Sequence, residues 1–533
     1  MRLPRRIVGR PRPPSSDRKG RARMECRRIG KTPSRRAAPH APCLGQGPGP
    51  APPRCAAPLA LAFRMLIRNA EILGRPADLR CRAGRITEIA PAIQAEPGET
   101  EIDARGGALV PGLHDHHVHL LALAAGFASI PCGPPEVESH ATFARVLADA
   151  RPVSGWIRGT GYFESVAGPL DRKGLDALQP RHPLRIQHRS GSMWFLNSAA
   201  IRRLDLDAGP RLPGIERDRR GRATGRLFRM DDWLRKRLPI HATPDLRPVG
   251  RRLASFGVTR LTDATPSNGA TELDLFRRAQ AEGALPQRLR LMGDLSLPIG
   301  APSAFLEVAE YKILLDEPSL PDLEELTRRI AVAHEHERTV ALHAVTRTEI
   351  HFALAALEAA GPLPGDRLEH ASVAPIEARN TIQRLGIRIV TQPHFISERG
   401  DAYLASVSSR DLPHLYLLRS WLEAGVRVHA GTDAPFGGAD PWLAMRAATK
   451  RRTRSGGILG IGERVEAEAA LALFSEAPSS AAMEGTAAGA LRVGRIADLC
   501  LLDAPWKDVR EDLAGDHVAL TVCDGEIIWR RGP

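Results

Sequence analysis

The central part of the sequence repeats one order of elements: a helix, then a short apolar strand, then a polar residue. The predicted helix and strand pairs cover residues 323–336 and 338–343, 350–360 and 365–370, 376–385 and 387–392, and 415–424 and 426–433. Strands that each follow a helix at this spacing predict parallel pairing. We expect an α/β fold whose centre is a (β/α)8 barrel, with the polar strand ends on one face.

Five polar positions lie in these strands or at their ends, in the order His117-Val118-His119, Lys312, His343, His370 and Asp433. Singly, each has an ordinary explanation: a structural histidine, a lysine reaching solvent from a strand end, or an aspartate capping a helix or turn. Alternate residues of a strand point the same way, so the two histidines of the first position can reach one metal. The ordered set, at separations of 193, 31, 27 and 63 residues, favours a metal site.

Imidazole and carboxylate ligands suit zinc, although other divalent transition metals remain open. Two tetrahedral metals need about eight donors and a bridging group, which four histidines and one aspartate do not provide. Lys312 carboxylated by CO₂ would provide the bridge, because a carbamate has two oxygens and no positive charge. A site with one metal and fewer of these ligands is the alternative.

Both ends of the globular part consist of short β-strands. Residues 65–73, 78–81 and 85–89 form one predicted set, and residues 497–502, 518–522 and 526–529 form the other, with a hairpin turn at Asp524-Gly525. We therefore expect residues 65–110 and 488–533 to build one composite β-sandwich. The barrel would cover residues 111–487, with an insertion at about 130–255.

The first 64 residues carry sixteen Lys and Arg but only two acids, which accounts for the whole net charge of +14. The segment is also rich in proline and has no apolar period, which predicts disorder. It could be an arm for nucleic acid or anionic membranes, a transit peptide, or a secretory or twin-arginine signal. We favour translation starting at Met65, where a strand pattern begins directly after the change in composition.

The remaining chain is neutral, which argues against a nucleic-acid partner. No run of 18 or more apolar residues predicts a membrane span. Seven scattered cysteines without a CxxC pair are typical of a reduced, cytoplasmic protein. A small-molecule substrate is the expected partner, and a homo-oligomer is left open.

The chain resembles the amidohydrolase superfamily, specifically the family 3 amidohydrolases that include formamide deformylase-like enzymes. The resemblance covers about residues 65–530. It rests on the five positions above and on Gly257-Val258-Thr259, Asn197-Ser198-Ala199, Gln392-Pro393-His394 and Val493 to Leu499. The chain departs from the family pattern at His116, at Glu317 and at Ser192. These departures leave the metal ligands intact but argue against transferring a relative's substrate.

The resemblance implies a metal-dependent hydrolase of a C–N bond, of amide, N-acyl or N-formyl type, acting through a metal-activated hydroxide. His117, His119 and Asp433 would hold one metal, His343 and His370 would hold the other, and carboxylated Lys312 would bridge them. Asp433 would also transfer the proton. Substrate-binding candidates are His394, His188, Arg189 and Tyr162. The alternatives are a deaminase, a lactone or ester hydrolase, and a non-catalytic metal-bound binding protein.

Overall fold

The computed structural model describes residues 64–209, 211–238, 244–298, 305–475 and 491–532. The basic segment predicted over residues 1–64 lies outside the described residues, apart from Arg64, so its alternatives stay predictions. Everything below concerns the described residues of the unit Leu59–Pro533.

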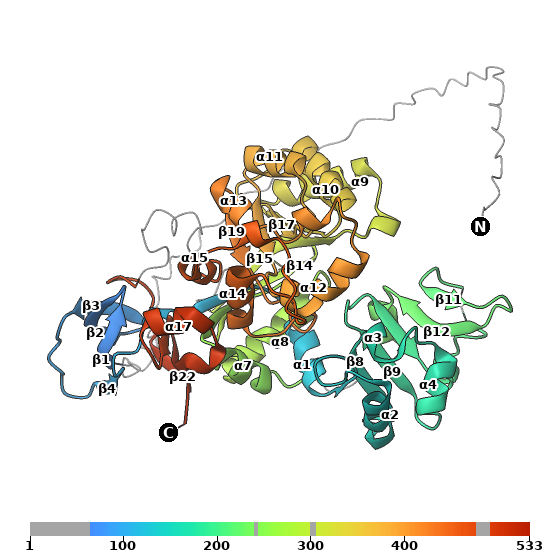
Figure 1. Cartoon of the computed structure of the whole chain (residues 1–533), viewed down its shortest axis with the longest axis horizontal. Coiled ribbons are helices and arrows are strands. Elements are labelled where there is room, and N and C mark those ends of the chain that lie inside the picture. The colour runs from blue at the N-terminus through green and yellow to red at the C-terminus, as the bar shows by residue number, and fades with distance from the viewer. Residues whose placement is uncertain (1–63, 210, 239–243, 299–304, 476–490, 533) are drawn as a thin grey trace, which may run out of the picture. The chain divides into compact units, whose positions relative to one another are not determined.

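An eight-stranded sheet forms the centre of this unit, and every hydrogen-bonded pair of neighbouring strands in it is parallel (Figure 1). In sheet order the strands are β6 (Leu113–Val118), β13 (Val258–Asp263), β14 (Arg288–Gly293), β15 (Leu306–Leu314), β16 (Val340–Ala344), β17 (Arg367–His370), β18 (Arg388–Thr391) and β19 (Val428–Ala430). Just after β19, the backbone N–H of Asp433 donates to the carbonyl oxygen of His117 in β6 (2.7 Å). This bond joins the two ends of the sheet, so the predicted (β/α)8 TIM-like barrel is confirmed.

Helices connect the barrel strands, and all of them except the one over Phe395–Ser406 share one large apolar core with the strands. Phe395 and Ile396 of that helix pack in a smaller cluster. They are α1 (Leu120–Phe127), α7 (Arg247–Ala254), α8 (Ala270–Ala281), α9 (Leu323–Glu335), α10 (Arg347–Ala360), α11 (Ile376–Leu385), α12 (Phe395–Ser406), α13 (Arg419–Glu423), α14 (Pro441–Lys450) and α15 (Ala467–Ala472). Short 3-10 helices are η1 (Glu317–Ser319), η2 (Leu412–His414) and η3 (Ile461–Glu463).

The helix predicted over residues 415–424 is wrong in its first half, because only α13 is helical there. The carbonyl oxygens of Leu415 and Tyr416 accept hydrogen bonds from the buried guanidinium of Arg451 (2.9 and 2.7 Å). They are therefore not available to helix amides, and Tyr416 adopts a left-handed backbone (φ +47°). A contact from a distant part of the chain overrides the local pattern.

Two four-stranded sheets form the composite sandwich expected from both ends of the globular part. One contains β3 (Arg85–Ala90), β2 (Arg75–Arg82), β1 (Arg64–Ile72) and β4 (Thr100–Asp103), and the other contains β22 (Glu526–Arg530), β21 (Val518–Cys523), β20 (Leu499–Leu502) and β5 (Leu109–Pro111). Side chains of both sheets share one apolar core, in which Met65 and Ile67 pack with Leu499 and Val522. Helix α17 (Trp506–Asp512) and η4 (Gly515–His517) lie between β20 and β21 in sequence.

The chain passes from the sandwich into the barrel within one residue. The apolar run before the histidines is strand β5 of the sandwich, which pairs with β20, and Gly112 separates it from β6. A β-carbon at Gly112 would lie 2.4 Å from side-chain atoms of Thr259 in β13. A side chain at this position would have to displace Thr259. The backbone N–H of Gly112 also donates to the carbonyl oxygen of Asp498 (2.9 Å), directly before β20, which anchors the start of the first barrel strand to the sandwich.

The insertion between α1 and α7 has a sheet of its own, in the order β11-β12-β10-β9-β8-β7. Its strands are β7 (Ile130–Pro131), β8 (Ile157–Tyr162), β9 (Leu184–His188), β10 (Met193–Leu196), β11 (Ile215–Arg217) and β12 (Ala223–Phe228), and its helices are α2 (His140–Asp149), α3 (Glu164–Ala167), α4 (Arg172–Leu178), α5 (Ser198–Arg203) and α6 (Asp231–Arg235). Two apolar clusters are made from its residues alone. The insertion therefore packs around cores separate from that of the barrel.

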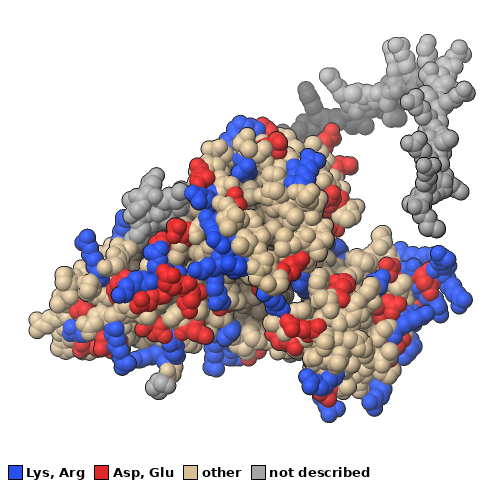
Figure 2. All heavy atoms as spheres, in the orientation of Figure 1, with Lys and Arg blue, Asp and Glu red and all other residues tan. Residues whose placement is uncertain are grey.

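On the face shown in Figure 2, basic and acidic side chains are interspersed over the described residues. This mixture agrees with the charge balance of the sequence after the N-terminal segment. Within the described ranges, no helix is both long and apolar enough to cross a membrane.

Candidate metal centre

Three histidines lie in strand β6 and a fourth, His119, follows it. His114 and His116 lie together on one side: their rings are 3.7 Å apart, and His116 also stacks with His429 (4.3 Å). The Nε2 atom of His114 contacts Thr262 Oγ1 (2.8 Å). His117 lies on the other side of the strand, so His116, where the chain departs from the family pattern, belongs to a separate histidine stack.

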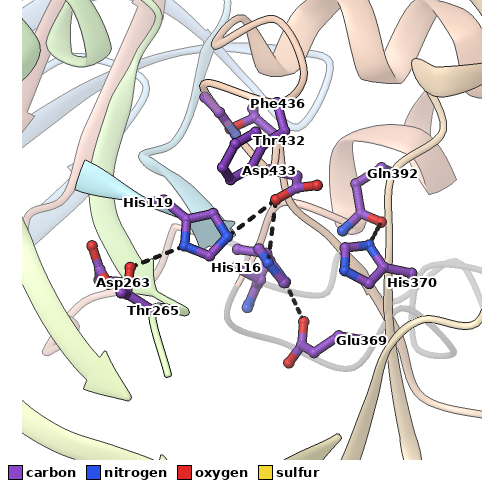
Figure 3. A network of polar contacts seen from close by, with 12 residues as sticks. His116, His119, Asp263, Thr265, Glu369, His370, Gln392, Thr432, Asp433 and Phe436 are labelled. Atoms are coloured by element: carbon purple, nitrogen blue, oxygen red, sulfur yellow. Dashed lines mark hydrogen bonds and ion pairs between the residues drawn. The ribbon is translucent and has the colours of Figure 1, made fainter. Parts of the chain in front are cut away.

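His117, His119 and Asp433 converge on one point. The Nε2 atoms of His117 and His119 lie 3.4 and 3.2 Å from the same oxygen, Asp433 Oδ1. One ligand atom from each of the three residues lies within 4.8 Å of the other two. His117 and Asp433 are buried, and His119 is nearly so. Figure 3 shows His119 and His370 on either side of Asp433.

The other predicted ligands border this group. The ring of His370 is 4.9 Å from that of His117 and 4.5 Å from that of His343. Lys312 projects from β15, buried, with its Nζ atom 3.9 Å from Glu369 Oε1 and without a hydrogen-bond partner in the described residues. The structure therefore brings all six predicted ligands into one region at the carboxyl ends of the barrel strands.

The backbone at two of these positions is left-handed. The φ angle is +70° at His370 and +53° at Asp433. Such conformations are uncommon outside glycine and persist only where the surroundings hold them, often at functional sites. At His370 the turn has a direct consequence: Glu369 and His370, although adjacent, both contact His117 instead of pointing to opposite faces.

Three imidazoles that face this region, those of His117, His119 and His370, are each oriented by a hydrogen bond at the Nδ1 atom. His117 donates to Glu369 Oε2, and His370 donates to Gln392 Oε1 (2.7 Å). His119 Nδ1 is paired with Thr265 Oγ1 (2.9 Å). These bonds leave each Nε2 atom free to face the centre, as partners of metal-binding histidines do.

The sequence analysis missed the orienting residues Thr265, Glu369 and Gln392. Glu369 is fully buried and also pairs with Arg367 (2.5 Å between Nε and Oε1). Its only sequence signal was an acidic side chain in an apolar strand directly before a predicted ligand. A carboxylate is unfavourable in an apolar environment unless it has a partner. A glutamate inside an apolar strand could therefore have been recognised as a residue that pairs with a neighbouring polar group.

The electrostatics of the site favour the protonation states that a metal requires. Burial lowers the pKa of His117 to about 3, against the opposing charge of Glu369, so the ring is neutral at pH 7. Burial alone would raise the pKa of Asp433, but its hydrogen bond with His119 and the nearby His117 and His370 keep it below its usual range. Neutral imidazoles and an ionised carboxylate are the donor set of a divalent metal, so these residues fit one.

His394, predicted as a substrate contact, is fully buried at the start of α12. Its Nε2–H donates to the carbonyl oxygen of Thr432 (3.0 Å), directly before Asp433. The Nδ1 atom has no partner in the described residues. The structure thus places His394 behind Asp433, where it holds the loop that carries this carboxylate.

The three candidates from the insertion occupy different positions. Tyr162 is fully buried in the core of the insertion, and its hydroxyl donates to the carbonyl oxygen of Gly168 (2.6 Å). His188, at the end of β9, contacts Glu164 Oε2 through Nε2 (3.2 Å). Arg189 follows it, with its guanidinium 3.4 Å from the centroid of the Phe163 ring. Tyr162 therefore packs inside the insertion, whereas His188 and Arg189 lie at its edge.

Comparisons with known proteins agree with this geometry. Residues 100–529 match the model of the amidohydrolase family. The chain is 27% identical to an N-substituted formamide deformylase of Arthrobacter pascens, over 84% of this chain and 93% of that protein. It is 23% identical to a putative amidohydrolase, YtcJ, of Bacillus subtilis, over 82% and 91%.

Among solved structures, the chain resembles an uncharacterized metal-dependent hydrolase from Pyrococcus horikoshii. The TM-score is 0.66 at 19% identity, and the match covers 84% of this chain and 99% of that one. This similarity supports the fold. The family match over most of the length shows that the chain belongs to the amidohydrolase family and is a metal-dependent hydrolase acting on carbon–nitrogen bonds.

Proposed function

We propose that the protein hydrolyses an amide, N-acyl or N-formyl bond of a small molecule. The observation that carries this proposal is the convergence of His117, His119 and Asp433 on one point at the carboxyl ends of the barrel strands. This is the face on which barrel enzymes carry their catalytic groups.

The donor set favours zinc, since imidazole nitrogen and carboxylate oxygen are its common ligands. We assign His117, His119 and Asp433 to one metal, and His343 and His370 to a second. Both histidines of the second set are kept neutral, because burial lowers the pKa of each. When bound, the metal supplies a water of lowered pKa and an electrophile for the carbonyl oxygen.

Lys312 is proposed as the bridging group in its carboxylated form. Burial lowers the pKa of its amine to about 8, so a fraction of the side chain is uncharged at neutral pH. The uncharged amine adds to the carbon of CO₂ and releases one proton, which gives a carbamate with two oxygens. The absence of a hydrogen-bond partner for Nζ among the described residues agrees with a group that is completed by modification.

Asp433 is proposed to accept the proton of the attacking water and to deliver it to the leaving nitrogen. Its Oδ1 atom lies between the two Nε2 atoms of His117 and His119. The hydrogen bond from His394 to the carbonyl oxygen of Thr432 fixes the loop behind it (3.0 Å). Glu369 and Thr265 keep the histidines oriented, so the carboxylate acts in a fixed environment.

The test is a screen of the full chain, loaded with zinc, against four substrate classes: N-formyl amines, N-acyl amines, cyclic amides and aminated rings. We expect turnover of the first two classes. A chelator should abolish this turnover, and added metal should restore it. Turnover of aminated rings alone would contradict the proposed bond type. Carbon-13 NMR of the full chain in ¹³C-labelled bicarbonate tests the bridge at neutral pH: we expect a protein-bound carbamate signal that is retained in Lys450→Met and lost in Lys312→Met.

A further inference from the structure

Two half-buried arginines from different parts of the chain lie beside the candidate metal centre. Arg189 follows β9 of the insertion, and its guanidinium stacks on Phe163 at 3.4 Å from the ring centroid. Arg399 belongs to α12 of the barrel, and its guanidinium stacks on Phe395 at 3.8 Å. Each is therefore held flat against an aromatic ring, which fixes a side chain that is otherwise flexible.

Phe436, in the loop after β19, places both arginines next to the centre. Its ring lies 5.3 Å from that of His119, edge to face. Its carbonyl oxygen accepts a hydrogen bond from Arg399. On the insertion side, Gly191 lies so close that a β-carbon there would be 2.4 Å from the Phe436 ring, and Gly191 is two residues from Arg189. Phe436 thus contacts the proposed ligand His119, Arg399, and the loop that carries Arg189.

No carboxylate lies within ion-pair distance of either guanidinium in the described part of the chain. Two acids that act on Arg189 electrostatically have other partners: Glu398 accepts from the N–H of Gly438 (2.9 Å), and Glu164 contacts His188 (3.2 Å). Burial, and then repulsion from Arg399, lowers the pKa of Arg189 to about 10. Burial opposes the charge of Arg399 as well, but Tyr403, Tyr416, Asp433 and Glu398 outweigh it and raise the pKa of Arg399. At pH 7 both side chains stay charged, so two guanidiniums lie at the edge of the centre without an ion-paired carboxylate.

For Arg189 this arrangement is unfavourable in the free protein, since its charge is partly withdrawn from water beside the like charge of Arg399. An anion placed between them would remove the repulsion and accept several charge-assisted hydrogen bonds. The planar guanidinium forks match a carboxylate in particular. The position beside His119 means that such an anion would belong to a molecule whose scissile bond reaches the metal centre.

We propose that Arg189 and Arg399 form a subsite for a carboxylate of the substrate. The substrate class is then N-formyl or N-acyl amino acids rather than N-formyl or N-acyl derivatives of amines that lack a carboxylate. The inference rests on the proposed function for its reaction, but the subsite itself can be tested without turnover. It also gives the insertion a role, because Arg189 is its contribution to substrate selection.

The first experiment compares two substrates that differ only in the carboxylate: N-formylphenylalanine and N-formylphenethylamine, with the zinc-loaded full chain. We expect kcat/KM to be at least about tenfold higher for the acid, the usual effect of a hydrogen bond to a charged group. Arg399→Met and Arg189→Met, which keep an unbranched apolar stem, should each reduce this ratio mainly through KM of the acid. Arg202→Met, at an exposed position of α5, is the matched control and should keep the ratio.

The second experiment measures binding alone, by calorimetric titration of the metal-free full chain with N-acetylphenylalanine and with its primary amide. We expect the acid to bind at least about tenfold more tightly, and this preference to be lost in Arg399→Met. If the neutral formamide is turned over as fast as the acid, the subsite is wrong and the proposed function stands. If neither is turned over but the acid still binds through the arginines, the proposed reaction is wrong and the subsite stands.

Discussion

The backbone N–H of Asp433 donates a hydrogen bond to the backbone carbonyl oxygen of His117, at 2.7 Å. The two proposed ligands are thus joined by the same bond that connects the first and last strands of the barrel. Closing the barrel and assembling the centre are therefore one structural event. Substitutions that change only the side chains leave this bond in place, so they can separate chemistry from folding.

Asp433→Asn should retain the fold and lose turnover. The backbone bond to His117 does not depend on the side chain, but an amide does not accept a proton at neutral pH. We expect kcat to fall by about 10²–10⁴-fold, the range for removing a general base, with an unchanged circular dichroism spectrum. Asp411→Asn, at a surface pair with Arg347 (2.6 Å), is the matched control. Unchanged turnover with metal still bound would show that Asp433 is not the proton acceptor.

Glu369→Gln should weaken metal binding rather than abolish one catalytic step. Its carboxylate accepts the Nδ1–H of His117, and the amide would hold the ring less strongly. We expect the metal affinity to fall by about 10–100-fold, measured as metal retained after dialysis against graded chelator. Glu358→Gln, in an exposed pair with Arg384 (2.7 Å), should retain the metal. Equal affinity in both variants would contradict an orienting role.

Gly431→Ala should disturb the centre without changing any ligand. A β-carbon at Gly431 would lie 2.4 Å from the backbone nitrogen and 2.8 Å from the Cα atom of His117. Backbone atoms cannot move aside, so the ends of the barrel would be pushed apart. We expect a lower melting temperature together with lost metal binding. Gly462→Ala, where a β-carbon meets nothing within 4 Å, should behave like the wild type.

Tyr162→Phe separates packing from substrate contact inside the insertion. The hydroxyl donates to the carbonyl oxygen of Gly168, and removing it leaves that buried acceptor without this partner. We expect a loss of about 1 kcal/mol in the free energy of unfolding and an unchanged kcat/KM. A large rise in KM with unchanged stability would instead show that Tyr162 contacts the substrate.

Asp440→Asn should change how stability depends on pH. The carboxylate of Asp440 accepts from the N–H of Trp442 at the start of α14 (2.9 Å), and burial raises its pKa to about 6. Because the folded protein holds this proton more tightly than the unfolded chain, the wild type loses stability as pH rises from about 4 to 6.

Asparagine caps helices equally well and has no such titration. The melting temperature of the variant relative to the wild type should therefore increase between pH 4 and pH 7. A difference that stays constant over this range would show that Asp440 does not titrate there.

The sequence predicted the barrel, the sandwich and the grouping of the six candidate ligands because these depend on local periodicity and on the order of polar residues. Helix α11 was predicted with the bounds that the structure has, Ile376 to Leu385. By contrast, the segment around Tyr416 was misread as helix, since its conformation is set by Arg451 from another element.

Contacts between distant residues also explain what was missed at the centre. Strand alternation assigns Glu369 to the face opposite His370, but the left-handed backbone at His370 turns both toward His117. Arg399 gave no signal, because nothing in its local sequence shows that the carbonyl oxygen of Phe436 lies beside it. Such relationships arise only when the loops of several strands are brought together.

The sandwich that anchors β6 has a consequence for biosynthesis. Strand β5 pairs with β20, and Met65 and Ile67 share their core with Leu499 and Val522. On the ribosome the first of these strands emerges long before the last, although domains otherwise tend to mature from the N-terminus onward. The nascent chain must therefore keep β5, which is directly joined to the strand of the candidate metal ligands, without its partner β20 until the end of translation.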